Sequence, residues 1–110
     1  MAQARPFSKY TMEAVKLLGR QIKLGRKQRR WSEAELAERA GIARATLQRI
    51  EKGDMACNIG LVFEVATLVG IKLFDADSDI IRGRIHEAEE KIALLPRHIH
   101  PHRKPVDDEF

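Results

Sequence analysis

The fold is decided within residues 25–53, which read GRKQRRWSEAELAERAGIARATLQRIEKG. Ser32 and Glu35 have the spacing of a capping box, in which each side chain accepts a hydrogen bond from the backbone N–H of the other residue. Gly41 can adopt the left-handed conformation that ends many helices. These signals predict a helix that begins after Ser32 and ends at about Ala40.

A second short helix is predicted almost directly after the first. Leu47 and Ile50 give residues 44–52 an inward apolar face, and Gly53 can terminate the helix. Ala43 stands at the cap position, where it offers no side-chain acceptor to the first backbone N–H groups. Two short helices joined by so tight a turn are a helix-turn-helix arrangement.

The segment before this pair is predicted to be a long helix over residues 11–30, preceded by an N-terminal arm over residues 1–10. Its apolar residues recur at helical spacing, and they are Val15, Leu18, Ile22 and Leu24. Its last turns are strongly basic, with Arg29 and Arg30 at the end. This basic end lies directly before the helix-turn-helix pair.

The segment after the pair is predicted to be a fourth helix over residues 58–69, capped by Asn58 and closed by Gly70. Apolar residues surround this helix almost completely, and they are Leu61, Val62, Phe63, Val65, Leu68 and Val69. A domain of four short helices is marginally stable by surface-to-volume scaling. One side of this helix can pack on the other helices of the domain, and the opposite apolar side is therefore expected to pack against a second subunit.

Residues 71–95 are predicted to continue with a short strand and a fifth helix. Residues 71–74 alternate apolar and polar side chains, which predicts a strand that needs a partner strand, as a dimer would provide. Ser78 is expected to cap a helix over residues 79–95 whose apolar stripe has the spacing of a helix-pairing seam. The predicted dimer contacts on this stripe are Ile81, Ile85 and Ile92. Residues 96–110 have too few apolar residues to fold alone and are predicted to be a flexible tail.

Positive charge is concentrated in the first half of the chain. Residues 1–57 hold 13 Lys and Arg against 6 Asp and Glu, whereas residues 58–110 hold 7 against 10. A basic half is the electrostatic footprint of a nucleic-acid binder, because release of counterions from phosphates supplies much of the affinity. The alternative is that these charges only solvate helix surfaces.

Size and composition disfavour other classes of protein. The chain has 110 residues, 44% of them hydrophobic, which fits one compact domain with tails, and it has no apolar run long enough to span a membrane. Its single cysteine, Cys57, cannot form an internal disulfide, which fits a cytoplasmic protein. No acid–base pair, nucleophile, phosphate loop or zinc spacing stands out, so we expect neither catalysis nor a cofactor.

The histidines of the tail and the single cysteine could each suggest a chemical role, but we expect neither to have one. His98, His100 and His102 alternate in a way that could suggest a metal site, but an unfolded proline-rich tail offers no preorganised geometry, so we expect no metal. Cys57 could sense oxidants, but no neighbour in the sequence except a helix start would lower its pKa, so we expect a packing thiol.

Residues 25–53 resemble the helix-turn-helix family of phage repressors and xenobiotic-response-element-type regulators. The resemblance extends over about residues 18–70 and includes Glu-Leu-Ala at 35–37, the turn glycine Gly41, and Ile-Glu-Lys-Gly at 50–53. It implies an all-α fold. We expect a four-helix lambda-repressor-like DNA-binding domain, followed by the short strand and an additional C-terminal helix.

By this resemblance, the helix over residues 44–52 enters the major groove of DNA. The implied base-reading residues are Arg44, Ala45, Thr46, Gln48 and Arg49. Arginine can fork the two acceptors of guanine, glutamine can fork adenine, and an alanine methyl can touch the thymine methyl. Phosphate contacts are expected from Arg29, Arg30 and Lys52, and from the amide groups that open two of the helices. The resemblance also pairs Arg26 with Glu51 in an internal salt bridge.

Two acidic residues depart from the family's pattern. Glu33 stands where a glutamine commonly meets a phosphate, and Asp54 stands where a basic residue is frequent. Both carboxylates would repel a phosphate oxygen, so neither residue is expected to contact DNA.

The chain also resembles the HipB-like antitoxins that partner HipA-type kinase toxins. This resemblance rests on the predicted strand and on Leu-Leu-Pro at 94–96 before a basic tail with an acidic end at 106–110. The leading hypothesis is a bacterial repressor that binds an inverted-repeat operator as a homodimer and that would autoregulate a toxin–antitoxin operon. The alternative is an antitoxin that mainly neutralises a HipA-like toxin by protein–protein binding, and an enzyme is the third hypothesis.

Overall fold

The computed structural model describes residues 6–99 and residue 101 of the chain. The described residues divide into two compact units, with the boundary between Asp75 and Ala76. The helices of the first unit are α1 (Lys9–Gln28), α2 (Glu33–Ala40), α3 (Arg44–Lys52) and α4 (Ile59–Leu68), followed by the short 3₁₀ helix η1 (Leu73–Asp75). The second unit contains α5 (Ser78–Ala93). The regular secondary structure of the described residues is therefore all helical and includes no strand.

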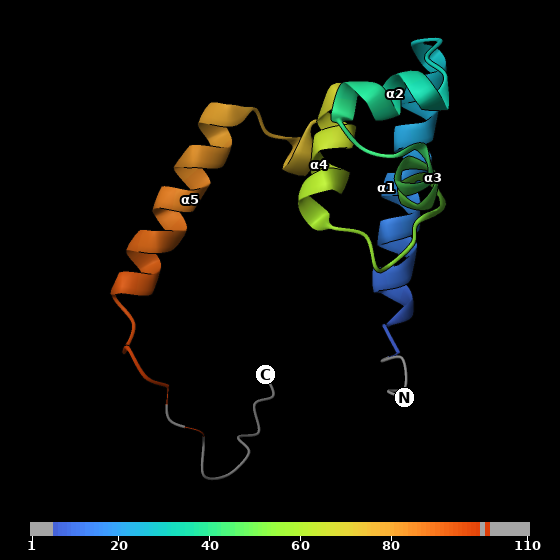
Figure 1. Cartoon of the computed structure of the whole chain (residues 1–110). Helices are drawn as coiled ribbons and strands as arrows, with labels where there is room; N and C mark the ends of the chain where they lie inside the picture. Colours follow the sequence, from blue (N-terminus) through green and yellow to red (C-terminus); the bar gives the residue numbers. More distant parts are fainter. Residues whose placement is uncertain (1–5, 100, 102–110) are drawn as a thin grey trace. The chain divides into compact units, whose positions relative to one another are not determined.

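The four helices of the first unit enclose one hydrophobic core. α1 and α2 each contact both α3 and α4 (Figure 1). The core draws on all four helices and on Val69, which directly follows α4. It consists of Ile22, Leu36, Ala37, Leu47, Ile50, Val65, Ala66 and Val69. Each fully buried Leu, Ile or Val side chain contributes about 1.5–3 kcal/mol relative to exposure. The inward positions predicted for Leu47 and Ile50 are confirmed, because both side chains are buried.

The helix α1 begins and ends slightly earlier than its apolar spacing predicts. The Ser8 hydroxyl accepts a hydrogen bond of 3.2 Å from the backbone N–H of Thr11, which allows the helix to begin at Lys9. The helix ends at Gln28 because Arg30 adopts a left-handed conformation with φ of 60°. There the Trp31 N–H bonds back to the Arg26 carbonyl oxygen at 3.1 Å, which turns the chain toward α2.

The predicted capping box of α2 is confirmed. The Glu35 carboxylate accepts from the Ser32 N–H at 2.7 Å, and the Ser32 hydroxyl accepts from the Glu35 N–H at 3.0 Å. Gly41 and Gly53 end α2 and α3 in the left-handed conformation, with φ of 70° and 83°. Ala43 makes no side-chain cap bond, so α3 starts without one.

The strand predicted at Ile71–Phe74 is wrong. Ile71 and Lys72 lead into η1, which contains Leu73 and Phe74, and Phe74 has φ of 59° and ψ of 22°, which no extended strand allows. The apolar alternation has another cause, because Ile71 and Leu73 pack against the helical core. The Phe74 ring meets the Phe63 ring edge to face, with centroids 6.2 Å apart. Packing within the chain therefore takes the place of pairing with another strand.

The helix α5 is capped by a different residue from the one predicted. The Asp77 carboxylate accepts a hydrogen bond of 3.0 Å from the Ile80 N–H, so Ser78 is the first helical residue rather than the cap. On the predicted seam, Ile81 is half-buried, whereas Ile85 and Ile92 are 53% and 65% exposed. None of the helices in the described residues is long and apolar enough to cross a membrane.

Candidate nucleic-acid interface

The helix α3 has a buried side and an exposed side, and the exposed side carries the predicted base-reading residues. Leu47 and Ile50 face the core. The exposed members of the predicted set are Arg44, Ala45 and Arg49, and the half-buried members are Thr46 and Gln48. The set is therefore presented on one short helix whose opposite side is fixed by packing.

A buried ion pair anchors α3 to α1, and it joins the two residues that the resemblance pairs. Arg26 and Glu51 are only 5% and 3% exposed. The Arg26 guanidinium donates from Nε to Glu51 Oε2 at 2.7 Å and from Nη2 to Glu51 Oε1 at 3.1 Å, a bidentate arrangement. Its Nη1 donates to the Trp31 carbonyl oxygen at 3.0 Å. The hydrogen bonds to Glu51 raise the pKa of Arg26, so the guanidinium stays charged.

The end of α3 also rests directly on α1. A Cβ atom on Gly19 would lie 2.6 Å from the Ile50 carbonyl oxygen, so the two helices approach as closely as a glycine permits. Arg20 Nη1 donates to the Glu51 carbonyl oxygen at 2.7 Å, which satisfies one of the free acceptors at the helix end. These contacts set the angle at which α3 projects from the domain.

Glu33, at the first position of α2, holds two of the predicted base-reading side chains. Its Oε1 atom accepts from Arg44 Nε at 3.0 Å and from Gln48 Nε2 at 2.9 Å. These hydrogen bonds, that of Gln48 first and that of Arg44 second, lower the pKa of the Glu33 carboxyl. The carboxylate is therefore charged at neutral pH and bridges two consecutive turns of α3.

Asp54, just after α3, contacts a third of the predicted base-reading side chains. Its Oδ2 atom lies 3.0 Å from Arg49 Nε, and its Oδ1 atom accepts from the Ala56 N–H at 2.8 Å. The Ala56 bond and then the Arg49 bond lower the pKa of Asp54, and the Asp54 bond raises the pKa of Arg49. The two residues that depart from the family's pattern thus both contact predicted base-reading side chains of α3 from within the protein.

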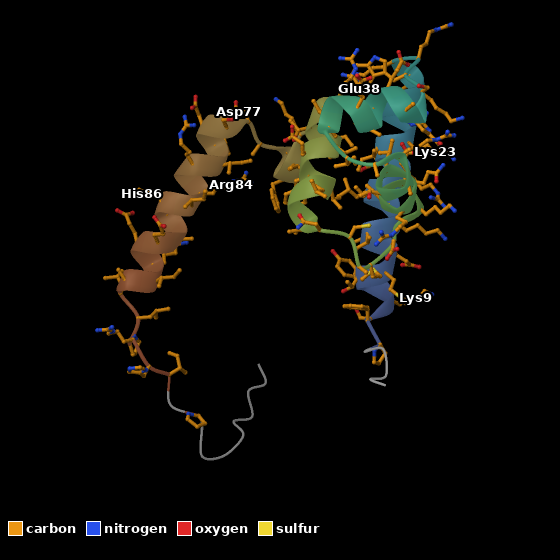
Figure 2. The ribbon with its side chains drawn as sticks, in the orientation of Figure 1. Lys9, Lys23, Glu38, Asp77, Arg84 and His86 are labelled. Atoms are coloured by element: carbon orange, nitrogen blue, oxygen red, sulfur yellow. The ribbon has the colours of Figure 1, made fainter. Side chains whose placement is uncertain are left out.

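Two basic residues beside the exposed side of α3, Arg20 and Lys23, were not among the predicted site residues. A depression of about 160 Å³ lies between α1 and α3 and is lined by Arg20, Lys23, Glu33, Gln48, Glu51 and Lys52. Lys23 is exposed on α1 (Figure 2). Lys52, a predicted phosphate contact, is exposed at the end of α3. The signal was present in the sequence, because Arg20 and Lys23 are three positions apart and share one face of a helix.

The other two predicted phosphate contacts lie at the end of α1. The Arg29 guanidinium carbon lies 5.7 Å from the centroid of the Trp31 ring, and Arg39 of α2 stacks on the same ring at 4.2 Å. Arg30 is exposed and has the left-handed backbone that ends α1. The phosphate contacts of Arg29 and Arg30 stay predictions.

The residues considered for metal or redox chemistry do not form a site in the described part of the chain. Cys57 is half-buried, and burial, with a smaller effect of the Asp54 charge, raises the pKa of its thiol. A thiol held in the neutral form is a poor nucleophile. His98 is exposed, and His100 and His102 lie outside the described residues.

Comparison with known proteins agrees with this geometry. Residues 22–75 match a protein family described as Helix-turn-helix. The matched segment runs from the middle of α1 to the end of η1 and includes α2 and α3. Residues 22–75 are therefore similar to the DNA-binding helix-turn-helix domains of transcriptional regulators. The match supports their assignment to the xenobiotic-response-element type. The comparison with curated proteins and that with solved structures each found no match.

Proposed function

We propose that this protein is a cytoplasmic transcriptional repressor that binds an inverted-repeat operator as a homodimer. The observation that carries the proposal is the outer face of α3, where Arg44, Gln48 and Arg49 stand on a helix anchored from behind by a buried ion pair. Guanidinium and amide groups are the side-chain groups best suited to fork base edges in the major groove. The proposed function is binding without catalysis.

Arg49 and Lys52 should affect DNA binding in different ways. Arg49→Ala should cost about 1–3 kcal/mol on the operator and relax the preference at one base pair, because a bidentate fork to guanine is lost. Lys52→Ala should weaken binding to all sequences about equally and flatten the salt slope by roughly one unit, because one phosphate contact is lost. Binding-site selection followed by salt titration on the selected site measures both effects.

Two results of the binding-site selection would contradict these assignments. If Arg49→Ala selects the wild-type sequence with unchanged strength at every position, α3 does not read bases through Arg49. If the wild type itself enriches no sequence, the protein is not a sequence-specific binder and the proposed function is wrong.

The homodimer is supported by the exposed apolar stripe of α5. Replacing Ile85 and Ile92 together by lysine should abolish dimerisation at micromolar concentration and weaken operator binding, because charges would be buried in an apolar contact. Leu94→Lys is the control, because Leu94, which directly follows α5, is also exposed and lies on the opposite side of the helix axis from both isoleucines. Light scattering measures the mass, and a monomeric wild type at high concentration would exclude this dimer.

The antitoxin alternative keeps less support than the repressor. Its resemblance rests partly on the strand at 71–74, but the last two of these residues lie in a 3₁₀ helix instead. The acidic end at 106–110 lies outside the described residues. Binding of a HipA-like toxin, and autoregulation of a toxin–antitoxin operon, therefore rest on sequence resemblance alone.

A further inference from the structure

We infer that Glu33 is a positioning residue that sets the base preference of Arg44 and Gln48 by holding them as one bridged unit. The inference rests on the proposed function, and it assigns to an acidic residue of α2 a part in DNA recognition. Glu33 does so without touching DNA, because it acts through two side chains of α3. The observation that carries it is the single carboxylate oxygen shared by both side chains.

The shared oxygen restricts each side chain to one orientation. Arg44 donates to it from Nε at 3.0 Å, so the two terminal Nη groups of the guanidinium remain as the donor pair for a base. Gln48 donates from Nε2 at 2.9 Å. A carboxylate accepts hydrogen bonds and donates none, so it fixes which end of the Gln48 amide faces α2.

The bridged arrangement leaves both side chains able to read a base. Gln48 keeps its Oε1 acceptor and a second N–H on Nε2, the pair that forks adenine. Arg44 keeps the planar pair that forks the two acceptors of guanine. Since long side chains lose rotamer freedom when they bind, two that are already ordered should lose less on the operator.

The charge of Glu33 should also disfavour contact between Arg44 and a DNA phosphate. An arginine at the start of a recognition helix can contact a phosphate of any DNA sequence as well as a base. The Glu33 carboxylate compensates the charge of Arg44 and would repel a phosphate placed beside it. Glu33 should therefore lower affinity for nonspecific DNA while it raises the preference for the operator.

The test compares Glu33→Ala with wild type by binding-site selection and salt titration. Glu33→Ala should lose about tenfold in the ratio of operator to nonspecific affinity, because Arg44 and Gln48 are no longer ordered before binding. Its salt slope on nonspecific DNA should steepen by about one unit, because Arg44 is free to contact a phosphate. A merely structural residue would weaken all sequences in parallel and would not steepen the slope.

Two control variants separate positioning from charge and from folding. Glu38→Ala removes the same charge from the same helix at an exposed position, and it should leave the selected sequence unchanged (Figure 2). Glu33→Gln keeps an acceptor oxygen but no charge, so it should retain more of the base preference than Glu33→Ala. The Glu33 side chain is 27% exposed, so both of its variants should fold, which circular dichroism checks.

A double-mutant cycle completes the test. Arg44→Ala and Gln48→Ala should be non-additive on the operator in the wild type and additive in the Glu33→Ala background. The inference is overturned if Glu33→Ala keeps the wild-type preference at the bases read by Arg44 and Gln48. That result differs from failure of the proposed function, in which the wild type would enrich no sequence.

Discussion

Glu51→Ala is expected to bring the DNA-binding domain close to unfolding under conditions where the wild type is folded. The substitution leaves the Arg26 guanidinium buried without its carboxylate partner, and breaking a buried ion pair in this way costs about 3–5 kcal/mol. A small single-core domain has a total stability of about the same size. Urea unfolding followed by circular dichroism measures the loss.

The double variant Arg26→Met with Glu51→Leu provides the matched comparison. Replacing both charges by apolar side chains of similar volume removes the need to bury an unpaired charge, so the double variant should be more stable than Glu51→Ala. Its free energy of unfolding should remain below that of the wild type, because the Trp31 carbonyl oxygen also loses its hydrogen-bond donor. A Glu51→Ala variant that loses less than about 1 kcal/mol would show that the pair is not an anchor of α3.

Signals between neighbouring residues made much of this fold predictable. A capping box depends on two residues three positions apart, and Ser32 and Glu35 form it as expected. Gly41 and Gly53 end their helices because the left-handed conformation requires little more than the absence of a Cβ atom. The ends of α2 and α3 were therefore readable from the chain itself.

The segment Ile71–Phe74 shows where such signals fail. Alternation over four residues is compatible with a strand and also with a turn that packs every second side chain on a core. The choice between them depends on α4, since Phe63 meets Phe74 and the core accepts Ile71 and Leu73. The sequence of these four residues alone does not specify the surface of α4 and the core against which they pack.

The roles of Glu33 and Asp54 were hidden for a related reason. Their types showed only that they would repel a phosphate. Their contacts with Arg44, Gln48 and Arg49 depend on where α2 and the residue after α3 lie relative to the exposed side of α3. That geometry is a product of the core, and it turns two departures from the family's pattern into partners of the proposed base-reading residues.

Gly53→Ala is expected to be far more damaging than Gly41→Ala, although both glycines end a helix in the left-handed conformation. An alanine at either position carries the backbone strain of that conformation, about 1–2 kcal/mol. A Cβ atom on Gly41 meets nothing within 4 Å, whereas one on Gly53 would lie 2.8 Å from the Lys16 Cα atom of α1. The overpacking adds about 1–3 kcal/mol at Gly53 alone.

The same pair of variants tests whether the seating of α3 on α1 controls DNA binding. Relief of the clash at Gly53 requires the end of α3 to move away from α1, because the Lys16 Cα is a backbone atom and cannot rotate aside. Gly53→Ala should therefore lose about 2–5 kcal/mol of stability and, where still folded, bind the operator at least about tenfold more weakly. Gly41→Ala should lose about 1–2 kcal/mol and keep its operator affinity. Equal losses in the two variants, measured by urea unfolding and operator titration, would show that close contact with α1 is not what holds α3 in place.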